Sequence, residues 1–402
     1  MKYLIVVPDG AADREIESLG GKTPLEASPM EYVNDLAANG EVGMVQTIPE
    51  GLSPGSDAAN LSVMGYDPLV YLTGRSPLEA ASIGIDMSPT DVAYRANIVT
   101  LSGDGEYETL IIKDHSSGDI STEEADELIK AINEEFENET IKFYTGVSYR
   151  HCLIVKNGDT AYELTPPHDV LEQVAGKHLP KGAGSEFIEK LMRRSYEILK
   201  EHPINKKRIE RGLNPANSLW IWGQGRKPAL PSFYEKFKIT GSAISEVDLI
   251  KGIGICAGLD SIDVPGATGT LHTNYEGMAQ AAIDEFKKGK DFIYLHIEAP
   301  DECSHQGSLE DKMQSINFID QRVVKLVVNY LKESGEDFKV LVVPDHRTPL
   351  VLRTHSSEPV PFVLYDSTKK VDPDTSRMFT ESSGEKGRFF ESGVALASYF
   401  FK

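Results

Sequence analysis

The stretch that decides the fold is Val340-Leu341-Val342-Val343-Pro344-Asp345-His346, an apolar run that ends in an acid and an imidazole. A short apolar run bounded by proline is typical of a buried strand, and its last residues then stand at the carboxyl end of that strand. Open α/β sheets carry their active sites at this edge. Residues 340–346 therefore predict an α/β sheet with chemistry at its carboxyl edge.

Two other stretches repeat this pattern. Residues 3–9 read Tyr-Leu-Ile-Val-Val-Pro-Asp, and the apolar residues 292–297 lead into a segment that contains Asp301 and His305. If the three strands are neighbours in one parallel sheet, as right-handed βαβ connections allow, the side chains at their ends converge. Asp and His supply the oxygen and nitrogen donors of metal sites, so the three strand ends predict a metal centre.

The ligands divide into two groups. Asp301 and His305 are four residues apart, so on a helical turn both side chains point the same way and can hold one ion. His355 follows in a loop nine residues beyond His346. We assign Asp301, His305 and His355 to one metal, and we assign Asp9, Asp345, His346 and the Ser56 hydroxyl to the other. Such sites without thiolate suit Mn²⁺, Zn²⁺, Mg²⁺ or Co²⁺.

Ser56 lies in Pro54-Gly55-Ser56-Asp57, a turn that leads into a short helix. Ser56 or Asp57 can serve simply as a cap of that helix. Alternatively, a hydroxyl on a glycine turn at the positive end of a helix can be a nucleophile that receives a phosphoryl group. These residues alone leave both interpretations open, and the second depends on whether metal ions are bound nearby.

The composition limits the kinds of protein that this chain can be. Its 402 residues suffice for two or three domains, and 40% hydrophobic and 26% charged residues are ordinary globular values. A formal net charge of −21 argues against a nucleic-acid or anionic-membrane surface. It leaves open an anionic small substrate, bound through a few Arg residues and cations, and also a homo-oligomer.

The three cysteines have no paired spacing, and the chain shows no signal sequence and no apolar span of about 20 residues. These features predict a cytoplasmic protein with reduced thiols.

From about residue 87 the pattern changes to strands joined by turns, followed by an acidic amphipathic helix over 122–135 with a capping box at Ser121 and Glu124. A second helix is predicted around 185–202. We therefore expect an inserted α+β domain at 87–213, and a core domain formed by 1–86 and 214–402. Two chain crossings would join them, so the inserted domain is predicted to act as a substrate-binding lid.

Several phrases together resemble the archaeal-type cofactor-independent phosphoglycerate mutases of the alkaline phosphatase superfamily. The resemblance covers nearly the whole chain in order. The phrases that carry it are Val7-Pro8-Asp9-Gly10, Pro54-Gly55-Ser56-Asp57, Gly65-Tyr66-Asp67-Pro68, Thr73-Gly74-Arg75-Ser76-Pro77-Leu78-Glu79, Lys251-Gly252-Ile253-Gly254, Val264-Pro265-Gly266-Ala267-Thr268-Gly269, Glu298-Ala299-Pro300-Asp301, Pro344-Asp345-His346 and Thr354-His355.

The resemblance implies an alkaline-phosphatase-like three-layer core with a mainly parallel sheet, plus an inserted α+β domain. It implies interconversion of 3-phosphoglycerate and 2-phosphoglycerate through a phosphoserine at Ser56, a reaction of glycolysis and gluconeogenesis. Two divalent cations, Mn²⁺ foremost, would take part, without 2,3-bisphosphoglycerate. Candidate contacts for the small phosphorylated hydroxy-acid substrate are Arg75, Arg95, Arg150 and Lys251.

Other activities stay open at this point. Bacterial relatives have been proposed to be homoserine kinases, although the chain has no P-loop motif. A metal-dependent phosphohydrolase and a catalytically inactive binding protein are further alternatives. The chain departs from the family at Arg347, where relatives usually have proline, and at Lys113-Asp114-His115, where archaeal enzymes are richer in arginine. His115 and His151 are candidates for a general acid.

Overall fold

In the computed structural model, which describes residues 1–402, β1 (Lys2–Pro8) is an inner strand of an eight-stranded sheet. Six of its seven residues are buried, as expected for a strand that is covered on both faces. The strand order is β13-β2-β12-β11-β1-β10-β8-β9. Only β12 runs antiparallel to its neighbours, so the sheet is mainly parallel, as predicted. The other strands are β2 (Glu41–Val45), β8 (Gly241–Ile244), β9 (Asp260–Ile262), β10 (Phe292–Ile297), β11 (Phe338–Val342), β12 (Val360–Asp366) and β13 (Arg388–Phe390).

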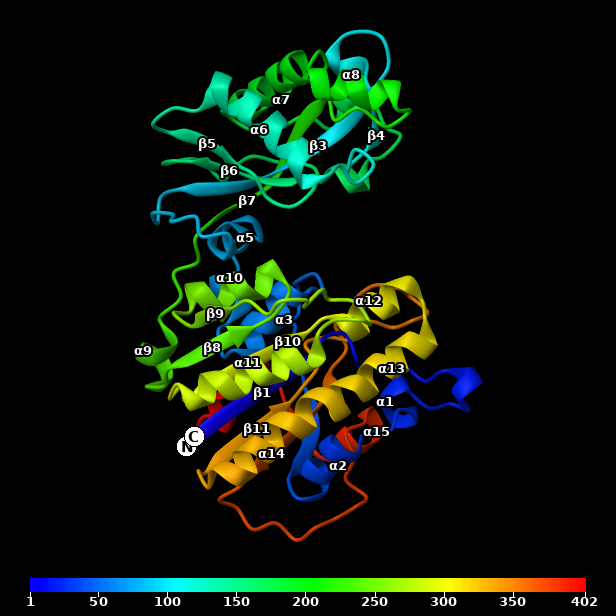
Figure 1. Ribbon diagram of the computed structural model, residues 1–402, viewed down its shortest axis with the longest axis vertical. Helices are drawn as coiled ribbons and strands as arrows, with labels where there is room; N and C mark the ends of the chain where they lie inside the picture. The colour runs from blue at the N-terminus through cyan, green and yellow to red at the C-terminus, as the bar shows by residue number, and fades with distance from the viewer. The chain divides into compact units, whose positions relative to one another are not determined.

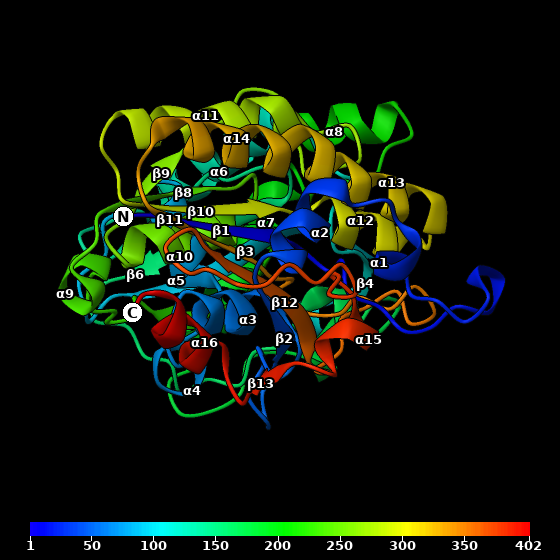
Figure 2. The same cartoon turned by 90° about the horizontal axis from the view of Figure 1, so that it is seen from below.

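Helices cover both faces of this sheet. Figure 2 shows α11 (Tyr275–Lys287) and α14 (Lys325–Ser334) on one side of the strands, and α3 (Ser56–Val63) and α16 (Gly393–Phe400) on the other. This is the predicted three-layer α/β core. None of the chain's helices combines the length and apolar character that a membrane span requires. The same unit also contains η1 (Glu17–Leu19), α1 (Pro24–Ala27), α2 (Glu31–Ala38), α4 (Pro68–Tyr71), α9 (Phe233–Phe237), α10 (Asp248–Cys256), α12 (Ala299–Gln306), α13 (Leu309–Ile319), the π-helical η5 (Asp320–Val324) and α15 (Glu381–Gly384).

A second unit has its own five-stranded sheet, in which all the pairs are antiparallel (Figure 1). The long strand β3 pairs with β4, β6 and β7, and β5 pairs with β6. Leu128, Leu191 and Trp220 are buried in its apolar core, which confirms the predicted α+β domain. Its elements are α5 (Ser76–Ser82), β3 (Val92–Ser102), η2 (Tyr107–Thr109), β4 (Ile111–Asp114), α6 (Thr122–Phe136), β5 (Ile141–Tyr144), β6 (Arg150–Val155), η3 (Pro167–Asp169), η4 (Ala175–Lys177), α7 (Glu186–Leu199), α8 (Pro203–Glu210) and β7 (Ser218–Arg226).

The limits of the two units differ from the predicted ones. The first unit is Met1–Leu72 with Ala229–Lys402, and the second is Thr73–Pro228. The sequence had placed the limits at 86/87 and 213/214. β7 belongs to the second unit because it pairs with β3, and α5 belongs there because Ala80 packs with Ala93 and Ile154. Residues 73–86 and 214–228 are therefore not part of the core domain.

Candidate metal centre and nucleophile

Three parallel strands end at the candidate site. Asp9 directly follows β1, Asp345 and His346 follow β11, and β10 leads into α12, which carries the remaining pair, Asp301 and His305. Because β10 and β11 both pair with β1 in parallel, their carboxyl ends lie at one edge of the sheet. His355 lies in the connection from β11 to the antiparallel β12, which must turn at that same edge. The sheet order thus brings together the residues that the sequence predicted would converge.

The first group is Asp301, His305 and His355. Nε2 of His305 lies 3.0 Å from Asp301 Oδ2 and 3.1 Å from His355 Nε2, and Nε2 of His355 lies 3.5 Å from Asp301 Oδ1. On the other side of its ring, His305 Nδ1 donates to the carbonyl of Arg353 at 2.9 Å. That hydrogen bond orients the ring so that Nε2 faces the carboxylate.

The carboxylate and the imidazoles of this group shift one another's pKa. Burial alone would raise the pKa of Asp301, but hydrogen bonds from His305 and His355 outweigh it and hold that pKa well below its usual range. The hydrogen bond to Asp301 raises the pKa of His305 to about 9. Asp301 is therefore an ionised acceptor at neutral pH.

The second group is Asp9, Asp345 and His346, with the hydroxyl of Ser56. Nε2 of His346 lies 3.1 Å from Ser56 Oγ, 3.4 Å from Asp345 Oδ2 and 3.5 Å from Asp9 Oδ1. Both aspartates and His346 are buried. Burial, together with the negative charges of Asp345 and Asp301, raises the pKa of Asp9 well above its usual range.

The donor atoms of these residues fit divalent cations. The ligand atoms of Asp9, Asp345 and His346 lie within 4.8 Å of one another, and so do those of Asp301, His346 and His355. Oδ1 of Asp9 is buried without a hydrogen-bond partner, a costly state that a bound cation would relieve. Carboxylate oxygens and imidazole nitrogens without thiolate are the donors that Mn²⁺ or Zn²⁺ accepts. By geometry His346 lies next to both groups, whereas the sequence assigned it to the second alone.

Ser56 is the first residue of α3, and the N-cap position belongs to Gly55, which has no side chain for capping. The Ser56 hydroxyl is therefore directed to His346 instead of capping the helix. The α3 amino end places partial positive charge beside it. Asn60, one turn along α3, donates to the Ser56 carbonyl and to Asp345 Oδ2, both at 2.8 Å. Asn60 thus links the nucleophile candidate to the second group.

Sequence reasoning missed three residues of this site: Asn60, His296 and Thr348. His296 lies inside β10, and its Nε2 is 3.0 Å from Asp9 Oδ2. The signal for Asn60 was its position four residues after Ser56 in a predicted helix. The signal for Thr348 was its position two residues after His346. His296 gave no signal, because it lies within an apolar strand.

Three of the four predicted substrate contacts lie in the second unit. Arg95 on β3 pairs across the sheet with Trp222, and its guanidinium lies 4.8 Å from that ring. Asn97, two residues along β3, pairs with Arg150 on β6. Side chains two residues apart or directly paired share a face of a sheet, so Arg95 and Arg150 stand on the same face. Arg75 is exposed just before α5.

The fourth predicted contact, Lys251, is part of the first unit. It lies on α10, and its Nζ is 2.7 Å from Asp263 Oδ1. Its role toward a substrate stays a prediction, as do those of the three arginines.

One of the two departures from the family pattern, Arg347, has a local explanation, and one of the two general-acid candidates, His151, is disfavoured. Arg347 donates through Nη1 to the Asp13 carbonyl at 2.9 Å and through Nε to the Pro359 carbonyl at 2.8 Å, so it fastens the segment that carries His346. His151 is buried in β6, where its Nδ1 accepts from the Gly146 amide at 3.2 Å. Burial lowers the pKa of His151 to about 3, which disfavours a role as a general acid at neutral pH.

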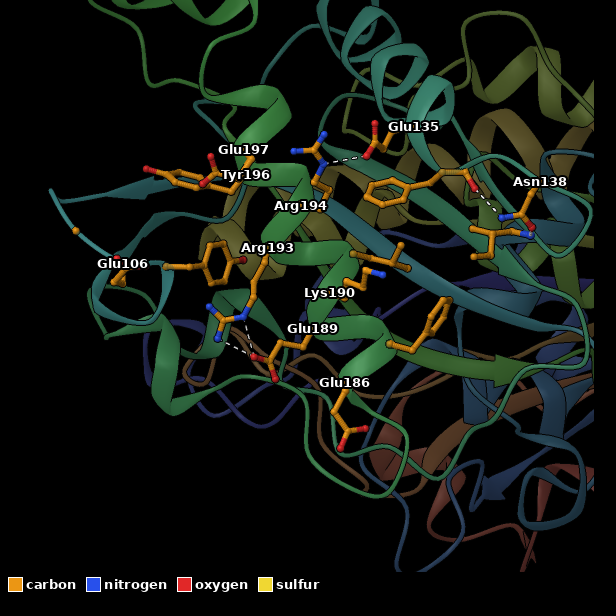
Figure 3. A pocket seen from close by; sticks show the side chains of 16 residues that line it. Glu106, Glu135, Asn138, Glu186, Glu189, Lys190, Arg193, Arg194, Tyr196 and Glu197 are labelled. Carbon is orange, nitrogen blue, oxygen red and sulfur yellow. Dashed lines mark hydrogen bonds and ion pairs between the residues drawn. The ribbon is translucent and has the colours of Figure 1, made fainter.

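A pocket of about 890 Å³ lies in the second unit and is lined by residues of α6, α7 and the segment near η2 (Figure 3). Its arginines are neutralised locally: Arg194 pairs with Glu135 at 2.9 Å, and Arg193 pairs with Glu189 at 2.6 Å. None of the predicted site residues lines this pocket.

Comparisons with known proteins show the family of the chain. The family model described as 2,3-bisphosphoglycerate-independent phosphoglycerate mutase matches residues 37–205. A protein of that name from Methanosarcina barkeri is 48% identical over 388 residues, which cover 96% of this chain and 96% of the relative. The solved cofactor-independent phosphoglycerate mutase of Thermoplasma acidophilum is 27% identical with a TM-score of 0.69, covering 100% of this chain and 99% of that one. A solved Pyrococcus horikoshii protein is 28% identical with a TM-score of 0.81, covering 99% of this chain and 96% of that one.

Because nearly the full length of both chains aligns at such identity, this chain belongs to the family of 2,3-bisphosphoglycerate-independent phosphoglycerate mutases.

Proposed function

We propose that this chain interconverts 3-phosphoglycerate and 2-phosphoglycerate without 2,3-bisphosphoglycerate, and that Ser56 is the group that carries the phosphoryl in between. The observation that supports this most is the position of Ser56 Oγ, 3.1 Å from His346 Nε2 at the edge where both acid-imidazole groups meet. Family membership supports the reaction and the small phosphorylated substrate.

Asp301, His305 and His355 would hold one divalent cation, and Asp9, Asp345 and His346 with Ser56 Oγ would hold the other. Mn²⁺ is the first choice, and Zn²⁺, Mg²⁺ and Co²⁺ are compatible with the same donors. Bound there, such cations stabilise the negative charge that develops during phosphoryl transfer.

The residues of the chain itself supply the rest of the reaction. The Ser56 hydroxyl gives up its proton, and its oxygen forms a bond to phosphorus while the bond from phosphorus to the glycerate oxygen breaks. The released glycerate oxygen takes up one proton and becomes a hydroxyl, so the step leaves the number of protons unchanged. The amino end of α3 favours the phosphoryl charge on Ser56. Glycerate then reorients and takes the phosphoryl group back on its other hydroxyl.

This return step requires that glycerate stay bound while water is excluded. We assign that task to the second unit, as a lid, with Arg75, Arg95 and Arg150 as substrate contacts, and with Lys251 of the first unit assisting. A phosphatase would need the same nucleophile but no such retention of the product.

The test is ³¹P NMR of the metal-reconstituted protein with 3-phosphoglycerate, in the absence of nucleotide and of 2,3-bisphosphoglycerate. Formation of 2-phosphoglycerate is the expected result. Release of inorganic phosphate alone would identify a phosphohydrolase instead. No reaction with any of the four metals would contradict the proposal and would call for a test with ATP and homoserine.

Ser56→Ala should lower turnover by on the order of 10⁴–10⁶-fold, as removal of a nucleophile does. Ser62→Ala is the matched control, since Ser62 lies on the same helix and its buried hydroxyl has no hydrogen-bond partner. That variant should keep wild-type turnover. Mutase activity that persists in Ser56→Ala would rule out Ser56 as the nucleophile.

A further inference from the structure

We propose that Thr348 is a positioning residue shared by the two candidate metal groups, and that its one hydroxyl orients a ligand of each. The inference rests on the proposed function, because it concerns how the ligands of that centre are held. Thr348 lies two residues after His346, at the start of the connection that later carries His355.

The Thr348 hydroxyl lies between the two groups. Its Oγ1 is 2.5 Å from Asp301 Oδ1, a ligand atom of the first group, and 3.2 Å from Nδ1 of His346, a ligand residue of the second. Thr348 is fully buried, so water cannot readily take over either hydrogen bond. A single side chain therefore contacts both groups.

The chemistry of a hydroxyl fixes the direction of these hydrogen bonds. Thr348 has one proton to donate, and a carboxylate oxygen can only accept, so the proton goes to Asp301. The Thr348 oxygen is then the acceptor for His346, whose ring proton must be on Nδ1. The opposite direction would leave two oxygen lone pairs facing each other at 2.5 Å.

The consequence for His346 is a defined tautomer. With the proton on Nδ1, the lone pair of Nε2 is directed to Ser56 Oγ and to the carboxylates of Asp9 and Asp345. This is the form of an imidazole that binds a metal ion. Thr348 thus determines which nitrogen of His346 carries the proton and, with the same hydroxyl, orients the carboxylate of Asp301.

The surrounding chain holds Thr348 in place. Its carbonyl accepts from the buried Lys312 Nζ at 3.0 Å, and its amide donates to the Ala12 carbonyl at 3.2 Å. Gly10 packs directly over the hydroxyl, since a Cβ at Gly10 would lie 2.5 Å from Thr348 Oγ1 and 2.6 Å from Asp301 Oδ1. The space for the Thr348–Asp301 hydrogen bond therefore depends on a residue without a side chain.

The first measurement is calorimetric titration of the metal-free protein with Mn²⁺ alone, without substrate. Thr348→Val and Thr348→Ala should both bind Mn²⁺ about 10–100-fold more weakly, as loss of a partner of metal ligands does. The alanine variant removes the hydroxyl without placing a methyl group against Asp301. Thr348→Ser keeps the hydroxyl and should bind Mn²⁺ with nearly wild-type affinity.

Thr100→Val is the matched control. Thr100 is a buried threonine of the second unit, and its hydroxyl donates to the Pro215 carbonyl at 2.8 Å. That variant loses a buried hydrogen bond of the same kind, but its Mn²⁺ affinity should be unchanged.

The second measurement observes the tautomer of His346 directly in the wild-type protein, so its result does not depend on the stability of a variant. Long-range ¹H–¹⁵N spectra of histidine-labelled, metal-free protein should show His346 with its proton on Nδ1, the signal being assigned by its disappearance in His346→Gln. In Thr348→Ala this preference should weaken. Rescue of affinity and of the tautomer by serine would support the inference.

Three results would overturn the inference: wild-type Mn²⁺ affinity in Thr348→Ala, equal losses in the alanine and serine variants, or a proton on Nε2 of His346 in the wild type. Failure of the wild-type protein to bind any of Mn²⁺, Zn²⁺, Mg²⁺ and Co²⁺ would instead overturn the proposed function, and this inference with it.

Discussion

Lys312→Met should destabilise the first unit strongly, because Lys312 is completely buried and paired. Its Nζ lies 2.7 Å from Asp13 Oδ2 and donates to the Thr348 carbonyl. Asp13 is also buried, and apart from Lys312 its carboxylate is bound only by the amides of Arg14 and Leu350. The substitution therefore leaves the buried carboxylate of Asp13 without its ion-pair partner.

Removal of one partner of a buried ion pair costs about 3–5 kcal/mol. Methionine has a similar length and fills the space, so no large cavity adds to this cost. For a domain of this size class, each kcal/mol lowers the unfolding midpoint by about 2–4 °C, which gives a decrease of roughly 6–20 °C. Differential scanning calorimetry at pH 7 measures this shift.

Two variants make the experiment specific. Lys332→Met removes an ion-paired lysine from the surface, where Nζ lies 3.3 Å from Asp35 Oδ2, and should cost no more than about 1 kcal/mol. The double variant Lys312→Met/Asp13→Asn removes the uncompensated charge and should recover part of the stability. A Lys312→Met midpoint as high as that of Lys332→Met would refute this account of the buried pair.

Two further predictions concern single residues in the two units. Gly10 has a φ of +60°, and an alanine in this left-handed conformation costs ~1–2 kcal/mol of the free energy of unfolding. Gly10→Ala should cost more than this, because its Cβ would also meet Thr348 and Asp301. Urea unfolding measures the loss. His151→Phe should flatten the pH dependence of the second unit. Burial lowers the pKa of His151 from 6.5 to about 3, so between these pH values His151 takes up a proton only in the unfolded chain. The free energy of unfolding therefore falls by about 1.4 kcal/mol for each unit by which the pH is lowered in this range. Tryptophan fluorescence reports this unit selectively, because both tryptophans lie in β7.

Each of these predictions has a matched control. Gly20 has φ +69° and open space around its Cβ position, so Gly20→Ala isolates the backbone strain from the contact with Thr348. A Gly10→Ala loss equal to that of Gly20→Ala would contradict the packing argument. For the pH series, His272→Phe changes an exposed histidine of the first unit and should leave the fluorescence-detected pH slope as in the wild type. An unchanged slope in His151→Phe would disprove the assignment.

The sequence was sufficient to predict the core of this fold and the set of residues that meet at its edge. β1 and β11 each contain a run of apolar residues and are followed within three residues by an acid, so the pattern predicted the two strands and the convergence of Asp9 with Asp345. The sequence pattern did not predict which strands lie next to each other in the sheets. β7 looked like the resumption of the core, but its pairing with β3 is a contact over more than 100 residues that no local pattern reveals.

The residues that contact the candidate metal ligands, such as His296 and Thr348, also could not be predicted from the sequence. His296 has the sequence context of an interior strand residue, and only the register of β10 against β1 places it beside Asp9. The role of Thr348 depends on Asp301, 47 residues away, and on the absence of a side chain at Gly10. Such contacts follow from the tertiary structure and cannot be predicted from spacing.

The interrupted layout of the first unit has a consequence for synthesis of the chain. β1 is made first, yet its neighbours β10 and β11 begin only at residues 292 and 338, after the entire second unit. At about 5–20 residues per second, the ribosome takes roughly 15–60 s to reach β10. The second unit is one continuous segment and can fold during this interval, whereas the apolar β1 has no strand to pair with. The edge that carries the candidate site therefore cannot form until β10 and β11 have been made, and the nascent chain carries an unpaired, aggregation-prone strand until then.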